Sequence, residues 1–186
     1  MSVVTALPKV RLSVFSLMLA SVTVRASAPA RGEPASGTPL IALAGINSLE
    51  LLHQLYGSII IPSAVKAELI GEPEKSAVAN SSWIVIKPIS QEERKRDFRA
   101  RLHAGEVEVM ILAEEICADL VIMDDYAAKK TAKFMGMKTT GTLGILIQAK
   151  KQGLIQKVKP LMESVIAQGL YVSEKIQRLI LREAGE

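Results

Sequence analysis

The sequence has few of the residues that build several common kinds of functional site. Its single cysteine excludes an internal disulfide and cannot by itself form a zinc site. The two histidines, His53 and His103, lack the spacing of metal ligands. Aromatic residues make up only 4% of the chain, which argues against a stacking platform for single-stranded nucleic acid.

Length, hydrophobic content and charge set the remaining bounds. A chain of 186 residues with 49% hydrophobic residues is sufficient for one α/β domain with a substantial core. The net charge of +4 is mildly basic, which is compatible with a polyanionic partner but does not identify one. No internal repeat is visible.

The first 38 residues differ in composition from the rest. Residues 1–24 combine two basic residues with an apolar stretch, and the sequence Ala-Ser-Ala at 26–28 completes a likeness to a secretory signal. The apolar stretch is too short to span a bilayer comfortably. We therefore predict an atypical extension at 1–38, either an export signal or an upstream sequence joined by a reading-frame error, and a folded domain at 39–186.

Short apolar strands alternate with amphipathic helices along the domain. This alternation predicts an α/β fold, a three-layer sandwich with a mainly parallel sheet. The predicted strands are 58–61, 83–86, 120–123 and 138–140. The predicted helices are 39–46, 48–56, 63–70, 75–79, a helix that Glu106 opens, 125–135, 141–151, 155–168 and 173–183, and 91–102 is either a charged helix or a loop.

Two adjacent carboxylates, Asp124 and Asp125, follow the apolar run 120–123. Such a run is typical of a buried parallel strand, and ligands of open α/β sheets bind at the carboxyl ends of the strands. Alternatively, either aspartate could cap the helix that follows. The pattern therefore places at least one carboxylate at the edge of the sheet where a ligand is expected.

Two glutamates on other elements point to the same site. Glu106 heads an apolar helix face that ends at Cys117, which we expect in the core, and a carboxylate in that position must be desolvated, paired or bound to a cation. Glu68 shares the inner face of its helix with Val65. Alternatively, the helix dipole favours Glu106 in a first turn, and Glu68 could be partly exposed.

Carboxylates from three elements, Glu68, Glu106 and Asp124, repel one another unless a cation lies between them. Hard ions such as Mg²⁺ and Mn²⁺ prefer these oxygen ligands together with water. Such an ion can activate water and stabilise an in-line displacement at phosphorus. The residues therefore predict a site for Mg²⁺ or Mn²⁺.

The motifs of the domain, taken in order, resemble those of the PIN-like nuclease domains, in the prokaryotic branch of predicted nucleic-acid-binding proteins related to VapC toxins. They lie at 39–44, 61–69, 104–106, 122–125 and 141–144, and the resemblance covers residues 38–186. It implies a cytoplasmic Mg²⁺- or Mn²⁺-dependent endoribonuclease that cuts single-stranded RNA and is inhibited by a cognate antitoxin. The matched acids are Glu68, Glu106 and Asp124, with Asp125 adjacent.

The chain departs from that family at the first strand. Family members have an apolar first strand that ends in an aspartate, whereas here Ser36 stands at that position after a stretch, 32–35, that is not apolar. We expect the first strand to be missing or replaced, and the metal site to be weakened. Glu33 is an unsuitable substitute because of Pro34 and the register.

Residues that could contact substrate flank the predicted ligands. They are Thr38, Arg96, Arg99, Lys129 and Lys130, and the basic ones could equally belong to ordinary solvated helix faces.

Three functions remain open. The first is the metal-dependent ribonuclease toxin, the second a degenerate PIN-like module that binds RNA or an antitoxin without cutting, and the third an exported α/β protein of unrelated role. PIN-like toxins commonly form homodimers, and Leu49, Leu52 and Leu55 offer either a dimer surface or, as we expect, part of the core.

Overall fold

The computed structural model describes residues 32–98 and 102–186, so the signal-like segment and Arg99 lie outside the described residues. The strands are β1 (Glu33–Pro34), β2 (Ile59–Ile61), β3 (Ile84–Ile86), β4 (Leu120–Ile122) and β5 (Lys138–Thr140). The α-helices are α1 (Gly37–Gly45), α2 (Glu50–Tyr56), α3 (Ser63–Glu68), α4 (Glu74–Ala79), α5 (Ala104–Glu115), α6 (Tyr126–Phe134), α7 (Thr142–Lys151), α8 (Lys159–Ala167) and α9 (Glu174–Ala184). A 3-10 helix, η2 (Glu92–Asp97), precedes α5, and none of the described helices is long and apolar enough to cross a membrane.

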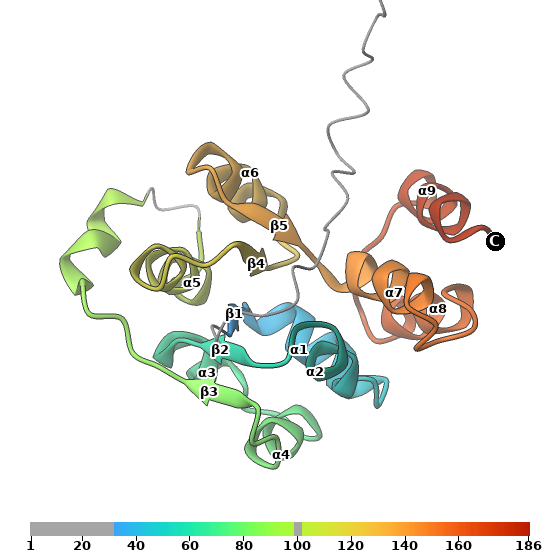
Figure 1. Ribbon diagram of the computed structural model, residues 1–186, viewed down its shortest axis with the longest axis horizontal. Coiled ribbons are helices and arrows are strands. Elements are labelled where there is room, and N and C mark those ends of the chain that lie inside the picture. The colour runs from blue at the N-terminus through green and yellow to red at the C-terminus, as the bar shows by residue number, and fades with distance from the viewer. Residues whose placement is uncertain (1–31, 99–101) are drawn as a thin grey trace, which may run out of the picture.

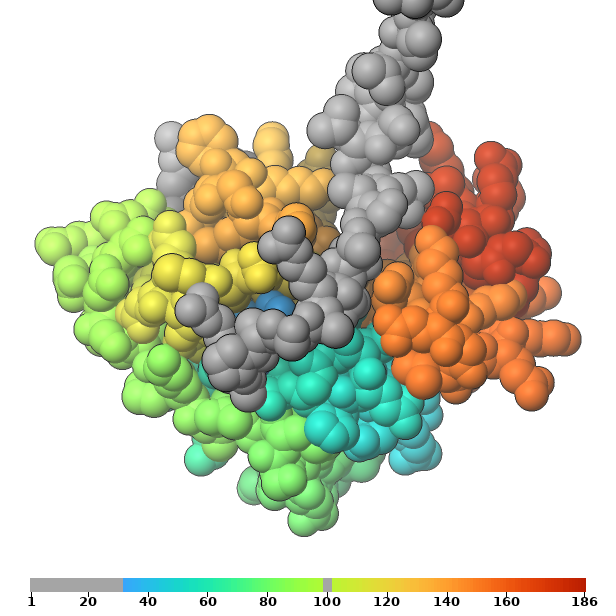
Figure 2. Space-filling view, in the orientation of Figure 1, coloured from blue at the N-terminus to red at the C-terminus, as the bar shows by residue number. Residues whose placement is uncertain are grey.

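All the strand pairs are parallel, as the alternation of strands and helices predicts. One small sheet has the order β1-β2-β3, the other pairs β4 with β5, and an isolated bridge from Ala35 to Ile122 joins them. The combined order is therefore β3-β2-β1-β4-β5, with α5 on one side of the strands and α1, α2 and α7 on the other (Figure 1). Figure 2 shows α7, α8 and α9 gathered at one end of the molecule, far from η2. The α/β prediction is confirmed.

The first strand is replaced rather than missing. Glu33 and Pro34 pair with β2, and the Ala35 amide donates to Ile60 O at 3.1 Å. On the other side, the Ser36 amide donates to Ile122 O at 2.9 Å. Because alternate residues of a strand donate to opposite neighbours, Pro34 would be the next donor to β4, and proline has no N–H. This missing donor explains why β1 joins β4 through a single bridge. Backbone hydrogen bonds thus hold a strand that its side chains do not predict.

Two expectations about the core have opposite outcomes. Leu49, Leu52 and Leu55 are buried, with 7%, 0% and 6% of their surfaces exposed, which confirms their assignment to the core. Cys117, expected in the core, is exposed, so that prediction is wrong. The reason is that α5 ends at Glu115, and Cys117 follows with a positive φ of 51°, which takes its side chain off the apolar helix face.

Glu33 does not supply the carboxylate that Ser36 lacks. Its Oε2 accepts a hydrogen bond from the amide of Leu120, the first residue of β4, at 3.2 Å. It therefore lies towards the amino end of β4, whereas Asp124 follows the carboxyl end. Burial raises the pKa of Glu33 to about 7. The charge of Asp119 adds a smaller rise, and the hydrogen bond from Leu120 opposes both.

The raised pKa of Glu33 predicts a pH-dependent stability. Because the folded pKa of about 7 exceeds the ordinary glutamate pKa of 4.5, this group's contribution to stability is fully present below pH 4.5 and is lost as the pH rises through 7. Because the carboxyl is partly exposed, solvent screening reduces the energetic effect of the pKa shift. We therefore expect Glu33→Gln to raise the free energy of unfolding by about 1–2 kcal/mol at pH 8 and by under about 0.5 kcal/mol at pH 5. Urea unfolding at both pH values measures this difference, and an equal effect at both would contradict it.

Candidate functional site

Glu68 is held in a narrow space between two glycines. Its Oε1 accepts a hydrogen bond from the Gly105 amide at 3.2 Å, at the start of α5. A Cβ on Gly105 would lie 2.3 Å from Oε1, and one on Gly37, the first residue of α1, would lie 2.6 Å from Oε2. The two glycines therefore allow the carboxylate to approach both helix starts. Burial raises the pKa of Glu68, and the Gly105 hydrogen bond opposes this rise.

Glu106 lies close to Glu68 and to Asp125. Its Oε2 accepts a hydrogen bond from the His103 amide at 3.0 Å, which is the capping-box arrangement for the start of a helix. Burial raises its pKa, and the charges of Asp125 and Glu68 raise it further, against the effects of His103. Glu106 thus lies within electrostatic reach of both Glu68 and Asp125.

The two aspartates after β4 have different partners. Asp124 accepts at Oδ1 from the Thr142 amide, at 2.9 Å, and at Oδ2 from the Thr142 hydroxyl. The Lys129 ammonium lies 3.8 Å from Asp124 Oδ1. Asp125 is exposed and caps α6, because its Oδ1 accepts from the Ala128 amide at 2.8 Å. Each oxygen of Asp124 therefore accepts a hydrogen bond from Thr142, and the capping interpretation holds for Asp125.

The other residues proposed to contact substrate are more dispersed. Lys129 is partly buried, and burial lowers the pKa of its ammonium while Asp124 raises it. Lys130 is exposed on α6, Arg96 is exposed on η2, and Thr38 is exposed in the first turn of α1. Of these four, the structure shows only Lys129 beside a proposed carboxylate.

Sequence reasoning missed two buried polar residues that organise this region. Glu108 is only 5% exposed; its Oε2 accepts from the Ala64 amide at 2.8 Å, and its Oε1 lies 2.7 Å from the Lys95 ammonium. Thr142 is fully buried and holds Asp124. The signal for Glu108 was a charge inside the apolar run 107–113, and the signal for Thr142 was its hydroxyl in the motif 141–144.

The carboxylates have suitable donor chemistry for Mg²⁺ or Mn²⁺, but their arrangement does not fit a bound ion. Within 32–98 and 102–186, no three Asp, Glu, His or Cys residues are placed so that they could hold a metal. Ser36 contributes no carboxylate at the end of β1, and both oxygens of Asp124 already accept hydrogen bonds from Thr142. The position that the sequence predicts for a metal therefore lacks a complete ligand set.

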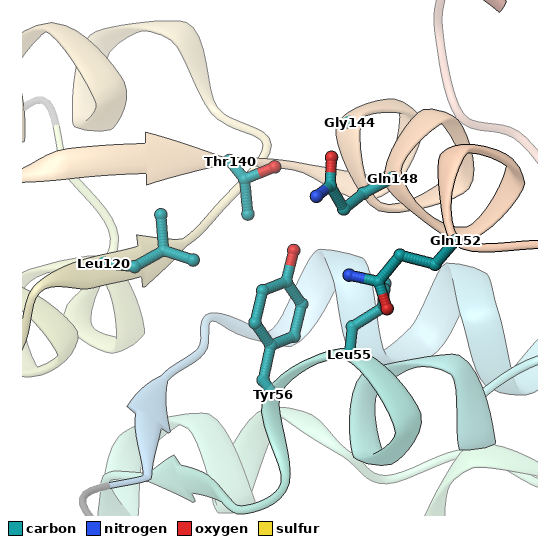
Figure 3. A pocket seen from close by; sticks show the side chains of 7 residues that line it. All are labelled: Leu55, Tyr56, Leu120, Thr140, Gly144, Gln148 and Gln152. Carbon is teal, nitrogen blue, oxygen red and sulfur yellow. The ribbon is translucent and has the colours of Figure 1, made fainter. Parts of the chain in front are cut away.

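A small cavity of about 50 Å³ lies beside α2, away from these carboxylates. Figure 3 shows the Tyr56 hydroxyl pointing towards Thr140, with the amides of Gln148 and Gln152 at the rim. Burial raises the pKa of Tyr56 to about 12. This volume is suited to one or a few water molecules rather than to a substrate.

The comparison with protein families identifies this architecture. A family model described as a PIN domain matches residues 35–186, which is well over half of the chain. The chain belongs to the PIN-domain family. PIN domains are generally nucleases, bind nucleic acid and use divalent metals, so this PIN domain is nuclease-like in class. A search of curated proteins and a search of solved structures each find no match to the chain.

Proposed function

We propose that this PIN domain binds single-stranded RNA and cuts it weakly or not at all. The observation that carries this proposal is the sheet edge, where Ser36 follows β1 without supplying a carboxylate and each oxygen of Asp124 accepts a hydrogen bond from Thr142. The Lys129 ammonium already balances part of the Asp124 charge. The family class supports a nucleic-acid partner. With RNA as that partner, the proposal includes a cytoplasmic location.

The charge of the site sets a condition on RNA binding. Glu68, Glu106 and Asp125 raise the local negative potential, and a phosphodiester that approaches them is repelled unless cations compensate. Binding must therefore depend on basic residues near the carboxylate edge. Among the described residues, Lys129 on α6 is the one that forms an ion pair with Asp124.

A second candidate function is the Mg²⁺- or Mn²⁺-dependent endoribonuclease, acting as a toxin that a cognate antitoxin inhibits and forming a homodimer. One observation favours it. Glu68, Glu106 and Asp125 each use one carboxylate oxygen, Oε1, Oε2 and Oδ1 respectively, in a hydrogen bond to a backbone amide. Their other oxygens accept no hydrogen bond from the described residues.

The test compares the full chain with Asp124→Asn on a fluorescently labelled, mixed-sequence single-stranded RNA. Anisotropy measures binding and gel electrophoresis measures cleavage, each with Mn²⁺ and with EDTA. We expect binding under both conditions, weaker at higher salt, and little or no cleavage by either protein. Mn²⁺-dependent cleavage that Asp124→Asn abolishes would support the ribonuclease instead, and absence of binding would contradict both functions.

A further inference from the structure

A groove of about 650 Å³ begins at Asp124 and extends along α9. Residues of α6, β5, α7, the segment 170–173 and α9 form its walls. In Figure 1, α6 and α9 lie on opposite sides of the connection from β5 to α7. The groove is thus continuous with the carboxylate edge, and a ligand in it would end beside Asp124.

Three lysines line this groove: Lys129, Lys133 and Lys151. Lys129 lies beside Asp124, and Lys151 pairs with Glu183 at 2.7 Å. Lys133 is exposed and follows Lys129 by one helical turn on α6. It forms no ion pair with any residue of 32–98 or 102–186. This lysine can therefore pair with an anion of the ligand at the cost of no existing ion pair.

Two tyrosines also line the groove and are largely exposed. Tyr126 is 78% exposed at the start of α6, and Tyr171 is 90% exposed before α9. Apolar side chains such as Leu143 and Ile147 also line the groove. Unstacked bases of single-stranded RNA stack on such rings, at about 1–3 kcal/mol per base. Low aromatic content excludes an extended stacking platform, but two rings are sufficient for two bases.

We propose that single-stranded RNA lies in this groove, with phosphates at Lys133 and Lys129 and bases against Tyr171 and Tyr126. This inference rests on the proposed function and adds the path by which RNA reaches the carboxylate edge. An acidic amphipathic peptide also has charge that complements the lysines. The two exposed tyrosines favour RNA, because a planar base stacks flat on the face of each exposed ring.

The test is RNA affinity of the full chain, measured by anisotropy with labelled single-stranded RNA. The groove variant is Lys133→Glu with Tyr171→Ala. The matched control is Lys157→Glu with Phe134→Ala, which makes the same charge change and removes an equally exposed ring, and neither residue lines the groove. We expect the groove variant to weaken binding by at least about twentyfold and the control by less than about twofold.

A second measurement separates charge from stacking. Lys133→Met is expected to reduce the slope of log affinity against log salt by about one phosphate contact, whereas Tyr171→Ala weakens binding without changing that slope. If the unsubstituted chain binds no RNA, the proposed function fails. If it binds RNA and the groove variant binds equally well, only the groove assignment fails, and the groove would then belong to another partner such as the peptide.

Discussion

Ser36→Asp is expected to cleave single-stranded RNA in Mn²⁺ at least about tenfold faster than the unsubstituted chain, a change of about 1.4 kcal/mol or more in the barrier. Ser36 lies at the carboxyl end of β1, where its amide donates to Ile122 O at 2.9 Å. The next residue, Gly37, lies against Glu68. A carboxylate at position 36 would therefore join Glu68 and Asp124 at the same edge of the sheet.

The physical reason is the number of negative ligands. Divalent cations bind more tightly as the count of carboxylate oxygens increases, and the present arrangement offers no group of three within its described residues. An added aspartate gives Mn²⁺ a further charged ligand without removing a present one. Cleavage products of labelled RNA, measured over a range of Mn²⁺ concentrations, report both the rate and the apparent metal affinity.

Ser36→Asn is the matched control, because asparagine has nearly the size of aspartate without its charge. Ser36 is only 5% exposed, so circular dichroism must first establish that both variants fold. The double variant Ser36→Asp with Asp124→Asn is expected to lose the gained cleavage. A folded Ser36→Asp protein that cleaves no faster than Ser36→Asn would show that the missing carboxylate does not limit activity.

Glu108→Ala is expected to lower the free energy of unfolding by about 2–3 kcal/mol. This carboxylate is 5% exposed and has two partners, the Ala64 amide and the Lys95 ammonium. Removing this carboxylate leaves the Ala64 amide, in the first turn of α3, without a hydrogen-bond acceptor, at a cost of about 1–3 kcal/mol. Lys95 is itself 39% exposed, so the lost ion pair contributes less than a fully buried pair would.

Two further variants separate these contributions in urea unfolding. Glu108→Gln keeps an acceptor for the Ala64 amide and is expected to cost only about 1 kcal/mol. Glu92→Ala, which removes the exposed second partner of Lys95, is expected to cost under about 0.5 kcal/mol. A Glu108→Ala protein as stable as Glu92→Ala would mean that the link from α5 to α3 contributes little. Since α3 carries Glu68, this link also positions the candidate site.

Local patterns were sufficient for most of the secondary structure. The strand predicted at 138–140 coincides with β5, and the other predicted strands differ from the structure by one residue at an end. Such strands are recognisable because apolar and β-branched residues cluster over a few positions. Prediction failed where a helix end moved, as at Cys117, because one positive φ rotates a side chain away from a face that periodicity assigns to it.

The sequence by itself determined the α/β class, the burial of Leu49, Leu52 and Leu55 and the order of carboxylates along the chain, since these follow from the spacing of neighbouring residues. Only the tertiary structure decided how those groups meet. Glu33–Pro34 becomes a strand because β2 and β4 offer backbone partners, and Pro34 limits its pairing with β4. Both oxygens of Asp124 accept hydrogen bonds from Thr142, 18 positions further along the chain. Hydrogen bonds between residues 18 or more positions apart leave no period in a sequence, so only the folded chain shows which oxygens remain available.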